Sequence, residues 1–210
     1  MNITVIFFLG LIIALVGVVP PGLLNMTAAK VSLKEGANRG IVFSIGVCLI
    51  VFLQTYIAAM LARYLSNHYY VVEILQRVAF VIFILITIYY LLVAKVPAKP
   101  EVEAHTKSGQ SRFFQGMFLS AINVFPVPYH AYMTITIAGF GWFDFEKSSI
   151  LTYVTGAAMG TFVMLYVYIF FFDKIKNKNF TSQKNMNYII GTITGIVAGI
   201  TLINIVMDWK

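Results

Sequence analysis

Apolar residues fill long, unbroken stretches of this chain instead of alternating with polar residues. Six stretches have this character, and none shows the period of two that a barrel strand requires. As helices they rise about 1.5 Å per residue and cross a hydrocarbon core of roughly 30 Å, the shorter ones with their flanking residues included. They cover residues 3–19, 41–62, 74–94, 113–140, 150–172 and 188–207. The pattern therefore predicts an all-α polytopic membrane protein with six transmembrane helices.

One hydrophilic segment separates the six stretches into two groups of three. It covers residues 95–112 and is rich in charged and polar side chains and proline. We therefore divide the chain into a first three-helix repeat at 1–94, a linker at 95–112 and a second three-helix repeat at 113–210.

The composition agrees with a membrane protein. Hydrophobic residues make up 60% of the 210 residues, and charged residues make up 11%. Soluble domains carry about 25% charged residues. The few charges cannot cover a water-facing surface, which excludes a soluble enzyme, a disordered protein and a nucleic-acid-binding domain despite the net charge of +7. We therefore expect the chain to be embedded in a lipid bilayer.

The reactive side chains are few and scattered. One cysteine, Cys48, allows no intrachain disulfide. The three histidines, His68, His105 and His130, form no metal-ligand pattern, so we expect neither a metal nor another cofactor. The chain has no GxSxG or HExxH motif. We therefore do not expect an enzyme, and a dyad of Ser120 with His130 is the one catalytic alternative.

Lysine and arginine gather in alternate loops. Eleven of the fifteen basic residues follow the first, third and fifth apolar stretches, and four lie at the other loops and the C-terminus. The positive-inside rule places the basic loops, including the linker, in the cytoplasm. Because the number of spans is even, both termini are predicted to lie outside.

The two halves of the chain share a sequence pattern. At an offset of 106 residues, Phe7, Phe8, Gly10, Val18 and Pro20 match Phe113, Phe114, Gly116, Val124 and Pro126. At an offset of 110, Gly46, Phe52 and Tyr56 match Gly156, Phe162 and Tyr166. Because each repeat has an odd number of spans, the second copy enters the membrane from the opposite side. The pattern predicts two inverted repeats with broken first helices, a design typical of transporters.

Prolines interrupt the first helix of each half at matching positions. Proline has no N–H and clashes with the carbonyl four residues earlier, so the Pro20-Pro21-Gly22 segment should end one helix, with a restart near Leu23. Half-helix N-termini suit a carboxylate, and freed carbonyls suit an ammonium group. Together they favour a small zwitterion such as an amino acid. The candidate substrate-binding residues are Pro20, Pro21, Gly22, Asn25, Thr27, Gln54, Tyr56, Asn123, Pro126, Pro128, Tyr129 and His130.

Several of these residues have a purely structural alternative. The prolines could only kink two helices, and Asn25 and Thr27 could cap the restarted helix. Gln54 and Tyr56 could make interhelical hydrogen bonds instead of lining a cavity. His130 is a candidate proton carrier, or a neutral imidazole that satisfies a freed carbonyl.

Three further features concern charge and packing. No Asp or Glu lies deep in any span, which favours a neutral substrate. The Ser32–Glu35 segment matches a capping box that would start a short helix. Glycines at four-residue spacing are typical of close helix packing, and they permit a homodimer without requiring one. They are Gly156 and Gly160 in the fifth span and Gly191, Gly195 and Gly199 in the sixth.

Short motifs along the whole chain carry a family resemblance. They are Pro21-Gly22 at the first break, Gly36-x-x-Arg39-Gly40 and Gly46 around the start of the second span, and Asn123 with Pro126 at the second break. With these motifs and its six spans the chain resembles the LysE/RhtB family of amino-acid exporters. The resemblance implies a small secondary transporter of the bacterial inner membrane, driven by the proton gradient.

The chain departs from the family pattern at three places. Leu23 stands where the family often has a second proline, and two residues separate Asn123 from Pro126. The acidic residue common in the second span is missing, with Ile50 and Val51 in that stretch. The leading hypothesis is an exporter of amino acids or similar zwitterionic metabolites. A metal-ion exporter of the same superfamily and a non-transporting membrane scaffold are the alternatives.

Overall fold

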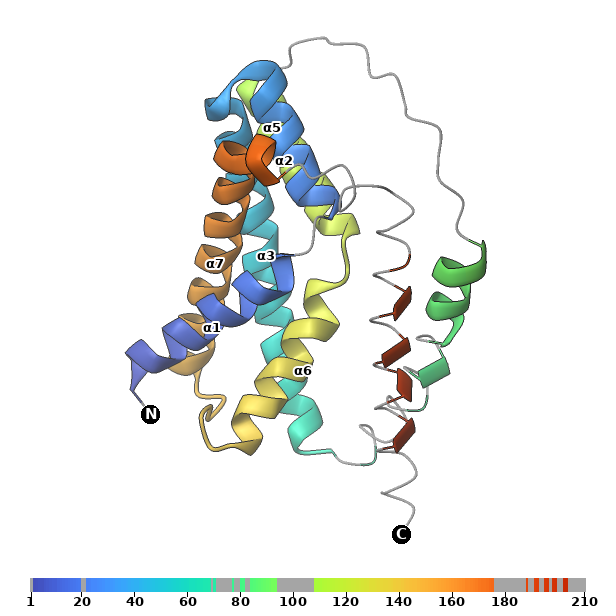
Figure 1. Cartoon of the computed structure of the whole chain (residues 1–210). Helices are drawn as coiled ribbons and strands as arrows, with labels where there is room; N and C mark the ends of the chain where they lie inside the picture. The colour runs from blue at the N-terminus through green and yellow to red at the C-terminus, as the bar shows by residue number, and fades with distance from the viewer. Residues whose placement is uncertain are drawn as a thin grey trace. The chain divides into compact units, whose positions relative to one another are not determined.

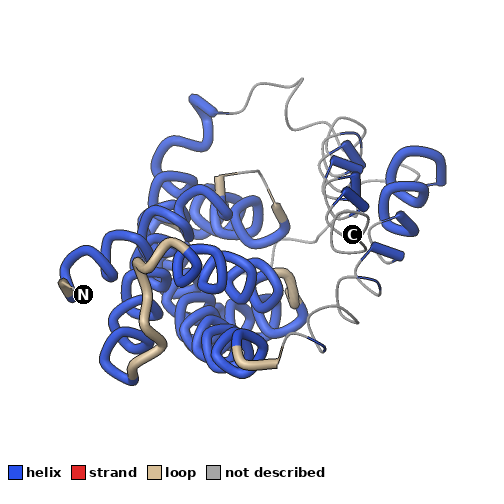
Figure 2. The backbone as a smooth tube through the Cα atoms, turned by 90° about the horizontal axis from the view of Figure 1, so that it is seen from below, coloured by secondary structure: helices blue, strands red, loops and turns tan. Residues whose placement is uncertain are grey.

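The computed structural model describes residues 2–19, 22–68 and 108–175, and also residues 70, 77, 80–81, 84–93, 188, 191–192, 195–196, 198–199 and 202–203. The described residues form helices joined by turns and loops, with no strand among them (Figure 2). The predicted all-helical class is confirmed over this part of the chain.

The chain folds as two compact units. Unit 1 joins Met1–Tyr64 to Glu103–Ile175, and unit 2 joins Leu65–Val102 to Lys176–Lys210. Each unit thus takes chain from both predicted repeats.

The first helical pair of unit 1 is bent. Helix α1 spans Ile3–Val18 and is capped by the preceding residue, Asn2, whose side chain accepts a hydrogen bond from the Thr4 N–H at 2.9 Å. Helix α2 spans Leu23–Glu35. The two helices make an angle of 80° (Figure 1). The predicted end of the first helix and its restart near Leu23 are confirmed, while Pro20 and Pro21 themselves lie outside the described residues.

The two longest described helices are α3, Ala37–Ser66, which belongs to unit 1 as far as Tyr64, and α7, Lys147–Ile175, which belongs to unit 1 throughout. At about 1.5 Å per residue each is roughly 45 Å long, more than a hydrocarbon core requires. Ala37–Ser66 and Lys147–Phe171 are long and apolar enough to cross a membrane, and the bent α1–α2 pair makes a third such span if it counts as one. This supports a membrane protein, and six spans remain a prediction.

The predicted fourth span is divided into two helices. Helix α5 covers Gly109–Ile122, with the Ser108 side chain accepting from the Ser111 N–H at 3.2 Å. Helix α6 covers Pro126–Gly139. Pro126 is the first residue of α6, where a missing N–H costs no helical hydrogen bond. The second proline break therefore lies at residues 123–125, between α5 and α6.

Glycines let two pairs of helices in unit 1 cross with their backbones in contact. A Cβ atom at Gly10 of α1 would overlap the carbonyl of Tyr153 in α7, and one at Gly156 would overlap the carbonyl of Phe7. Gly160 meets the Leu11 carbonyl in the same way. The predicted packing role of Gly156 and Gly160 is confirmed, as small residues at such crossings allow close van der Waals contact.

The second crossing joins α3 and α5. A Cβ atom at Gly46 would overlap the carbonyl of Phe113, and one at Gly116 would overlap the carbonyl of Phe43. In this crossing, as in the first, a glycine on each helix faces a carbonyl on the other.

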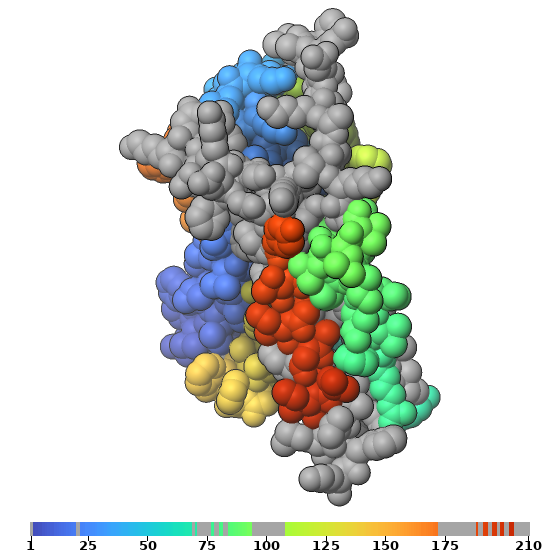
Figure 3. Space-filling model, turned by 45° about the vertical axis from the view of Figure 1, so that its right-hand side comes forward, coloured from blue at the N-terminus to red at the C-terminus, as the bar shows by residue number. Residues whose placement is uncertain are grey.

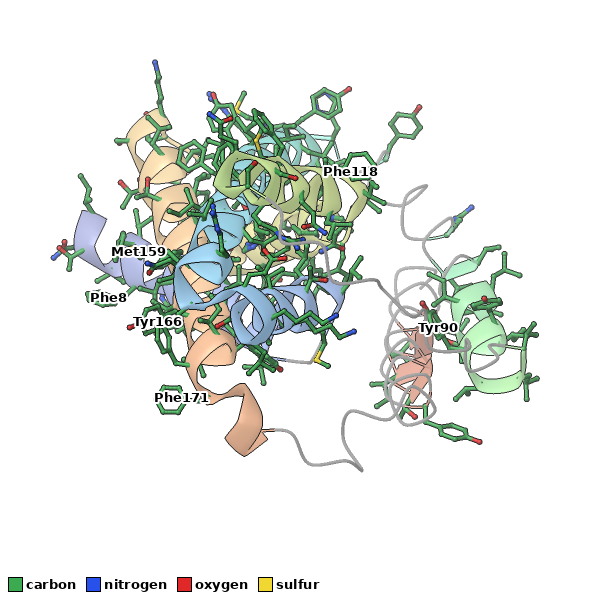
Figure 4. The ribbon with its side chains drawn as sticks, turned by 90° about the horizontal axis from the view of Figure 1, so that it is seen from above. Phe8, Tyr90, Phe118, Met159, Tyr166 and Phe171 are labelled. Atoms are coloured by element: carbon green, nitrogen blue, oxygen red, sulfur yellow. The ribbon has the colours of Figure 1, made fainter. Side chains whose placement is uncertain are left out.

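The outer side of unit 1 is apolar. Figure 4 shows Phe8 of α1 and Met159, Tyr166 and Phe171 of α7 pointing away from the packed helices. These four side chains are between 43% and 53% exposed. Large exposed apolar side chains of this kind suit contact with lipid acyl chains.

One end of unit 1 gathers basic residues from distant parts of the chain. The Arg112 guanidinium at the start of α5 pairs with the Glu35 carboxylate at the end of α2, and Arg39 lies against Gly109. The Ser32 hydroxyl donates to the Ile169 carbonyl of α7 at 3.4 Å. These contacts bring together the regions of three basic loops that the sequence assigns to one side.

The same contacts correct the capping-box interpretation of Ser32 and Glu35. Both residues lie in the last turn of α2, which ends before Gly36. Glu35 pairs with Arg112, and Ser32 contacts α7. The Ser-x-x-Glu pattern therefore serves tertiary contacts at a helix end and does not start a helix.

Unit 2 is described in part. Its described residues include an apolar helical stretch at Ile84–Val93, whose last turn, Tyr89–Val93, is a π-helix. Figure 3 shows the described residues around this stretch (green) beside those after residue 188 (red). A Cβ at Gly191 would lie 2.6 Å from the Leu91 side chain, and one at Gly195 would lie 3.4 Å from Thr87. No described atom lies within 4 Å of a Cβ built at Gly199, so the third glycine of the stripe makes no such contact with the described residues.

Candidate functional site

The candidate site consists of the two helix breaks of unit 1 and the side chains around them. At the first break the chain leaves α1 at Val18 and enters α2 at Leu23, with Gly22 in an extended conformation before α2. The last carbonyls of α1 have no partner within the helix and must find one elsewhere.

Two side chains satisfy the carbonyls at the end of α1. The Asn25 amide donates to the Val18 carbonyl at 2.7 Å, and the Tyr168 hydroxyl of α7 donates to the Val19 carbonyl at 2.8 Å. Asn25 therefore caps the C-terminal end of α1. The alternative that it caps the start of its own helix, α2, is wrong. Thr27 also leaves the start of α2 uncapped, because its hydroxyl donates to the Leu23 carbonyl at 2.7 Å.

The second break is held by one side chain from α3. The Gln54 amide nitrogen lies 3.1 Å from the Ser120 carbonyl and 2.9 Å from the Asn123 carbonyl. Through its amide nitrogen Gln54 makes the interhelical hydrogen bond that the sequence allowed. Gln54 thus donates to backbone carbonyls at the second break, as Asn25 and Tyr168 do at the first.

The two breaks lie next to each other. Tyr129, in the first turn of α6, donates its hydroxyl hydrogen to the Ile13 carbonyl of α1 at 2.8 Å. Its ring lies against Gly17, where a Cβ atom would be 2.7 Å from the ring. Tyr129 also stacks on Phe125, with ring centroids 5.5 Å apart. One side chain of the second break therefore contacts the last turns of the helix that enters the first break.

The helix N-termini at the two breaks differ in their hydrogen-bond donors. In α6, Pro126 and Pro128 have no N–H. The Val127 and Tyr129 N–H groups donate to the Val124 and Phe125 carbonyls, each at 3.2 Å. In α2 the first residues, Leu23 and Leu24, keep their N–H groups and no side chain caps them. Of the two described helix starts, α2 is therefore the one that offers first-turn N–H groups to a carboxylate.

Three buried side-chain oxygens near Gln54 and the second break have no hydrogen-bond partner among the described residues. They are Gln54 Oε1, Thr55 Oγ1 and Ser120 Oγ. Gln54 is 8% exposed, and Thr55 and Ser120 are fully buried. Because a buried polar atom without a partner costs free energy, each calls for an explanation.

His130 is buried in α6 and bonded to a tyrosine. Its Nδ1 lies 2.9 Å from the hydroxyl of Tyr153 in α7, and the side chain is 3% exposed. The hydrogen-bond partner of the His130 imidazole is thus the Tyr153 hydroxyl. It is not the freed carbonyl that one alternative predicts. Ser120 does not hydrogen-bond to His130, since the Ser120 hydroxyl has no partner among the described residues, which include His130. The Thr134 hydroxyl donates to the His130 carbonyl at 2.8 Å.

One further predicted residue lies away from the carbonyl contacts at the breaks. Tyr56 is half-buried and packs against a core cluster that contains Ile6, Ile137 and Tyr153. The sequence analysis does not identify Tyr153 or Tyr168, although Tyr153 is hydrogen-bonded to His130 and Tyr168 to the Val19 carbonyl. Nothing in the sequence separates these two from the other tyrosines of the chain.

Comparison of the chain with protein-family models, with curated proteins and with solved structures finds no match. Among the described residues, no group of three His, Cys, Asp or Glu side chains is placed to hold a metal ion.

Proposed function

We propose that this protein is a secondary transporter that exports amino acids or similar small zwitterionic metabolites by alternating access. The observation that carries the proposal is the meeting of two helix breaks, one from each half of the chain, through Tyr129. Broken helices at corresponding positions of two halves are typical of transporter binding sites.

The glycine crossings support an inverted repeat. Gly10 and Phe7 correspond to Gly116 and Phe113 at the offset of 106, and Tyr153 corresponds to Phe43 at the offset of 110. The crossing of α1 with α7 and the crossing of α5 with α3 therefore use the same four positions. Each crossing joins one half of the chain to the other, so rocking of the repeats would pivot at these two contacts.

The chemistry of the breaks supports a zwitterionic substrate. The first N–H groups of α2 suit a carboxylate, and the C-terminal ends of α1 and α5 carry the partial negative charge that suits an ammonium group. The side chains around the breaks carry no net charge, so a neutral amino acid fits better than a dibasic one. His130, bonded to Tyr153, is the candidate for proton coupling.

The arrangement of basic residues supports the proposed membrane orientation. The end of unit 1 that carries Arg39 and Arg112 would face the cytoplasm of a bacterial inner membrane, with both termini outside. In a six-span protein the linker at 95–112 would then be cytoplasmic.

The test is flux of labelled amino acids in proteoliposomes with an imposed pH gradient. The wild-type protein should move at least one neutral amino acid in a gradient-dependent way. Tyr129→Phe removes the hydroxyl that joins the breaks and should lower flux about fivefold, the factor for one hydrogen bond of roughly 1 kcal/mol. Tyr132→Phe is the matched control, because Tyr132 is 65% exposed on the same helix. Absence of flux for every amino acid would overturn the proposal in favour of a scaffold.

A further inference from the structure

We infer that Gln54 and Ser120 bind the ammonium group of the transported molecule at the C-terminal end of α5. This inference rests on the proposed function and specifies one end of its binding site. It starts from two buried oxygen atoms, Gln54 Oε1 and Ser120 Oγ, that have no hydrogen-bond partner in the described part of the chain.

The orientation of the Gln54 amide follows from its contacts. Its nitrogen faces two carbonyl oxygens, those of Ser120 and Asn123, at 3.1 Å and 2.9 Å. The reverse orientation would place the amide oxygen against two acceptors and leave both without a donor. The amide oxygen is therefore held on the other side of the amide group, where it needs a donor.

The second atom lies on a residue that Gln54 already contacts. The Gln54 amide bonds the backbone of Ser120, and the Ser120 hydroxyl is fully buried with no partner among the residues that the structure describes. The two oxygens thus belong to one hydrogen-bonded pair of residues that joins α3 to the last turn of α5. A ligand with at least two donors at one atom could satisfy both.

The charge of the surroundings selects the kind of donor. The last turn of α5 ends at Ile122, and its carbonyls give this helix end a partial negative charge. A primary ammonium group carries three N–H donors and a positive charge. It matches two oxygens at a helix C-terminus better than a neutral hydroxyl or amide would.

The first break does not offer the same set of atoms. There Asn25 and Tyr168 satisfy the two carbonyls, and the unpartnered buried side-chain atoms found in the described residues include none from these two. The ammonium site is therefore assigned to the second break alone. Thr55 Oγ1 is not assigned to it, because successive residues of a helix point about 100° apart and Gln54 is the one bonded to α5.

Ser120→Ala tests the assignment, because a structural hydroxyl and a ligand-binding hydroxyl predict different effects on transport. If the Ser120 hydroxyl has only a structural role, its removal should leave transport unchanged. If it binds the ammonium group, the apparent KM for the amino acid found in the flux assay should rise about tenfold while the protein folds at least as well. Ser44→Ala is the matched control, since Ser44 is equally buried but donates to the Gly40 carbonyl at 2.9 Å.

Competition against the wild-type protein tests the same point without a variant. The N-acetylated and the deaminated forms of the transported amino acid lack the ammonium group and should fail to compete. Its methyl ester keeps the ammonium group but loses the carboxylate, so it should compete less strongly than the amino acid and more strongly than the N-acetylated form. If the N-acetylated form competes as well as the unmodified amino acid, or if Ser120→Ala has normal flux and an unchanged KM, the ammonium site is wrong. Neither result would contradict the transporter proposal.

A sodium ion is the other cation that two oxygens could hold. If flux requires Na⁺ and Ser120→Ala removes only that requirement, the site belongs to the ion and the ammonium assignment is wrong. Unaltered flux when choline replaces Na⁺ supports the ammonium assignment.

Discussion

The ion pair of Glu35 and Arg112 should contribute strongly to the stability of unit 1. The Arg112 guanidinium donates through Nε to Glu35 Oε2 at 2.8 Å and through Nη2 to Oε1. The two side chains are 11% and 6% exposed. Exposed ion pairs contribute about 0–1 kcal/mol, but this pair is bidentate and nearly buried.

Arg112→Met keeps most of the apolar stem of the side chain and removes the charge. It leaves the Glu35 carboxylate buried without its arginine, and breaking a buried pair in this way costs about 3–5 kcal/mol. We therefore expect the free energy of unfolding to fall by about 3–5 kcal/mol.

The assay is denaturant unfolding in detergent micelles for a double-mutant cycle with Glu35→Gln. The double variant should be more stable than the two single losses added together, by up to about 3 kcal/mol. Lys30→Met, an exposed cation on α2, is the control and should change stability by less than about 0.5 kcal/mol. If Arg112→Met lowers the free energy of unfolding by less than about 1 kcal/mol, or if the cycle is strictly additive, then the Glu35–Arg112 ion pair is not a strongly stabilising buried pair.

Three further predictions concern packing and buried polar groups. Gly10→Ala should cost about 1–3 kcal/mol, because its methyl group would overlap the Tyr153 carbonyl, whereas Gly139→Ala enters open space and should be neutral in the same unfolding assay. Thr55→Val removes a buried hydroxyl that has no partner among the described residues and should raise the unfolding midpoint; a lower midpoint would show that the hydroxyl is bonded. Tyr153→Phe removes the hydroxyl bonded to His130 and should shift the pH dependence of flux, and an unchanged profile would exclude His130 from proton coupling.

Proline and glycine made the main features of unit 1 predictable. A proline lacks an N–H wherever it stands, so the interruption before Leu23 and the start of α6 at Pro126 followed from local chemistry. The repeat of Gly10 at Gly116 and of Gly46 at Gly156 was also visible in the sequence. Small residues that recur at equivalent positions have few other uses in lipid than close packing.

The partners of the polar side chains could not be predicted, because they come from distant parts of the chain. Glu35 pairs with a residue 77 positions away, and no local rule distinguishes that from a capping box. Tyr168 reaches the Val19 carbonyl across 149 positions. Which tyrosine finds a freed carbonyl depends on how α7 packs, and that packing is set by glycines elsewhere on the helix.

The differences between the two breaks give the proposed site a direction. Two equivalent breaks would bind a zwitterion equally well in either orientation. Here Pro126 and Pro128 remove N–H donors from the start of α6, while α2 keeps its own, so a carboxylate has one suitable helix N-terminus. The unpartnered oxygens of Gln54 and Ser120 lie at the other break, beside the end of α5. A bound amino acid would therefore have its carboxylate toward the first break and its ammonium group toward the second, in one orientation only.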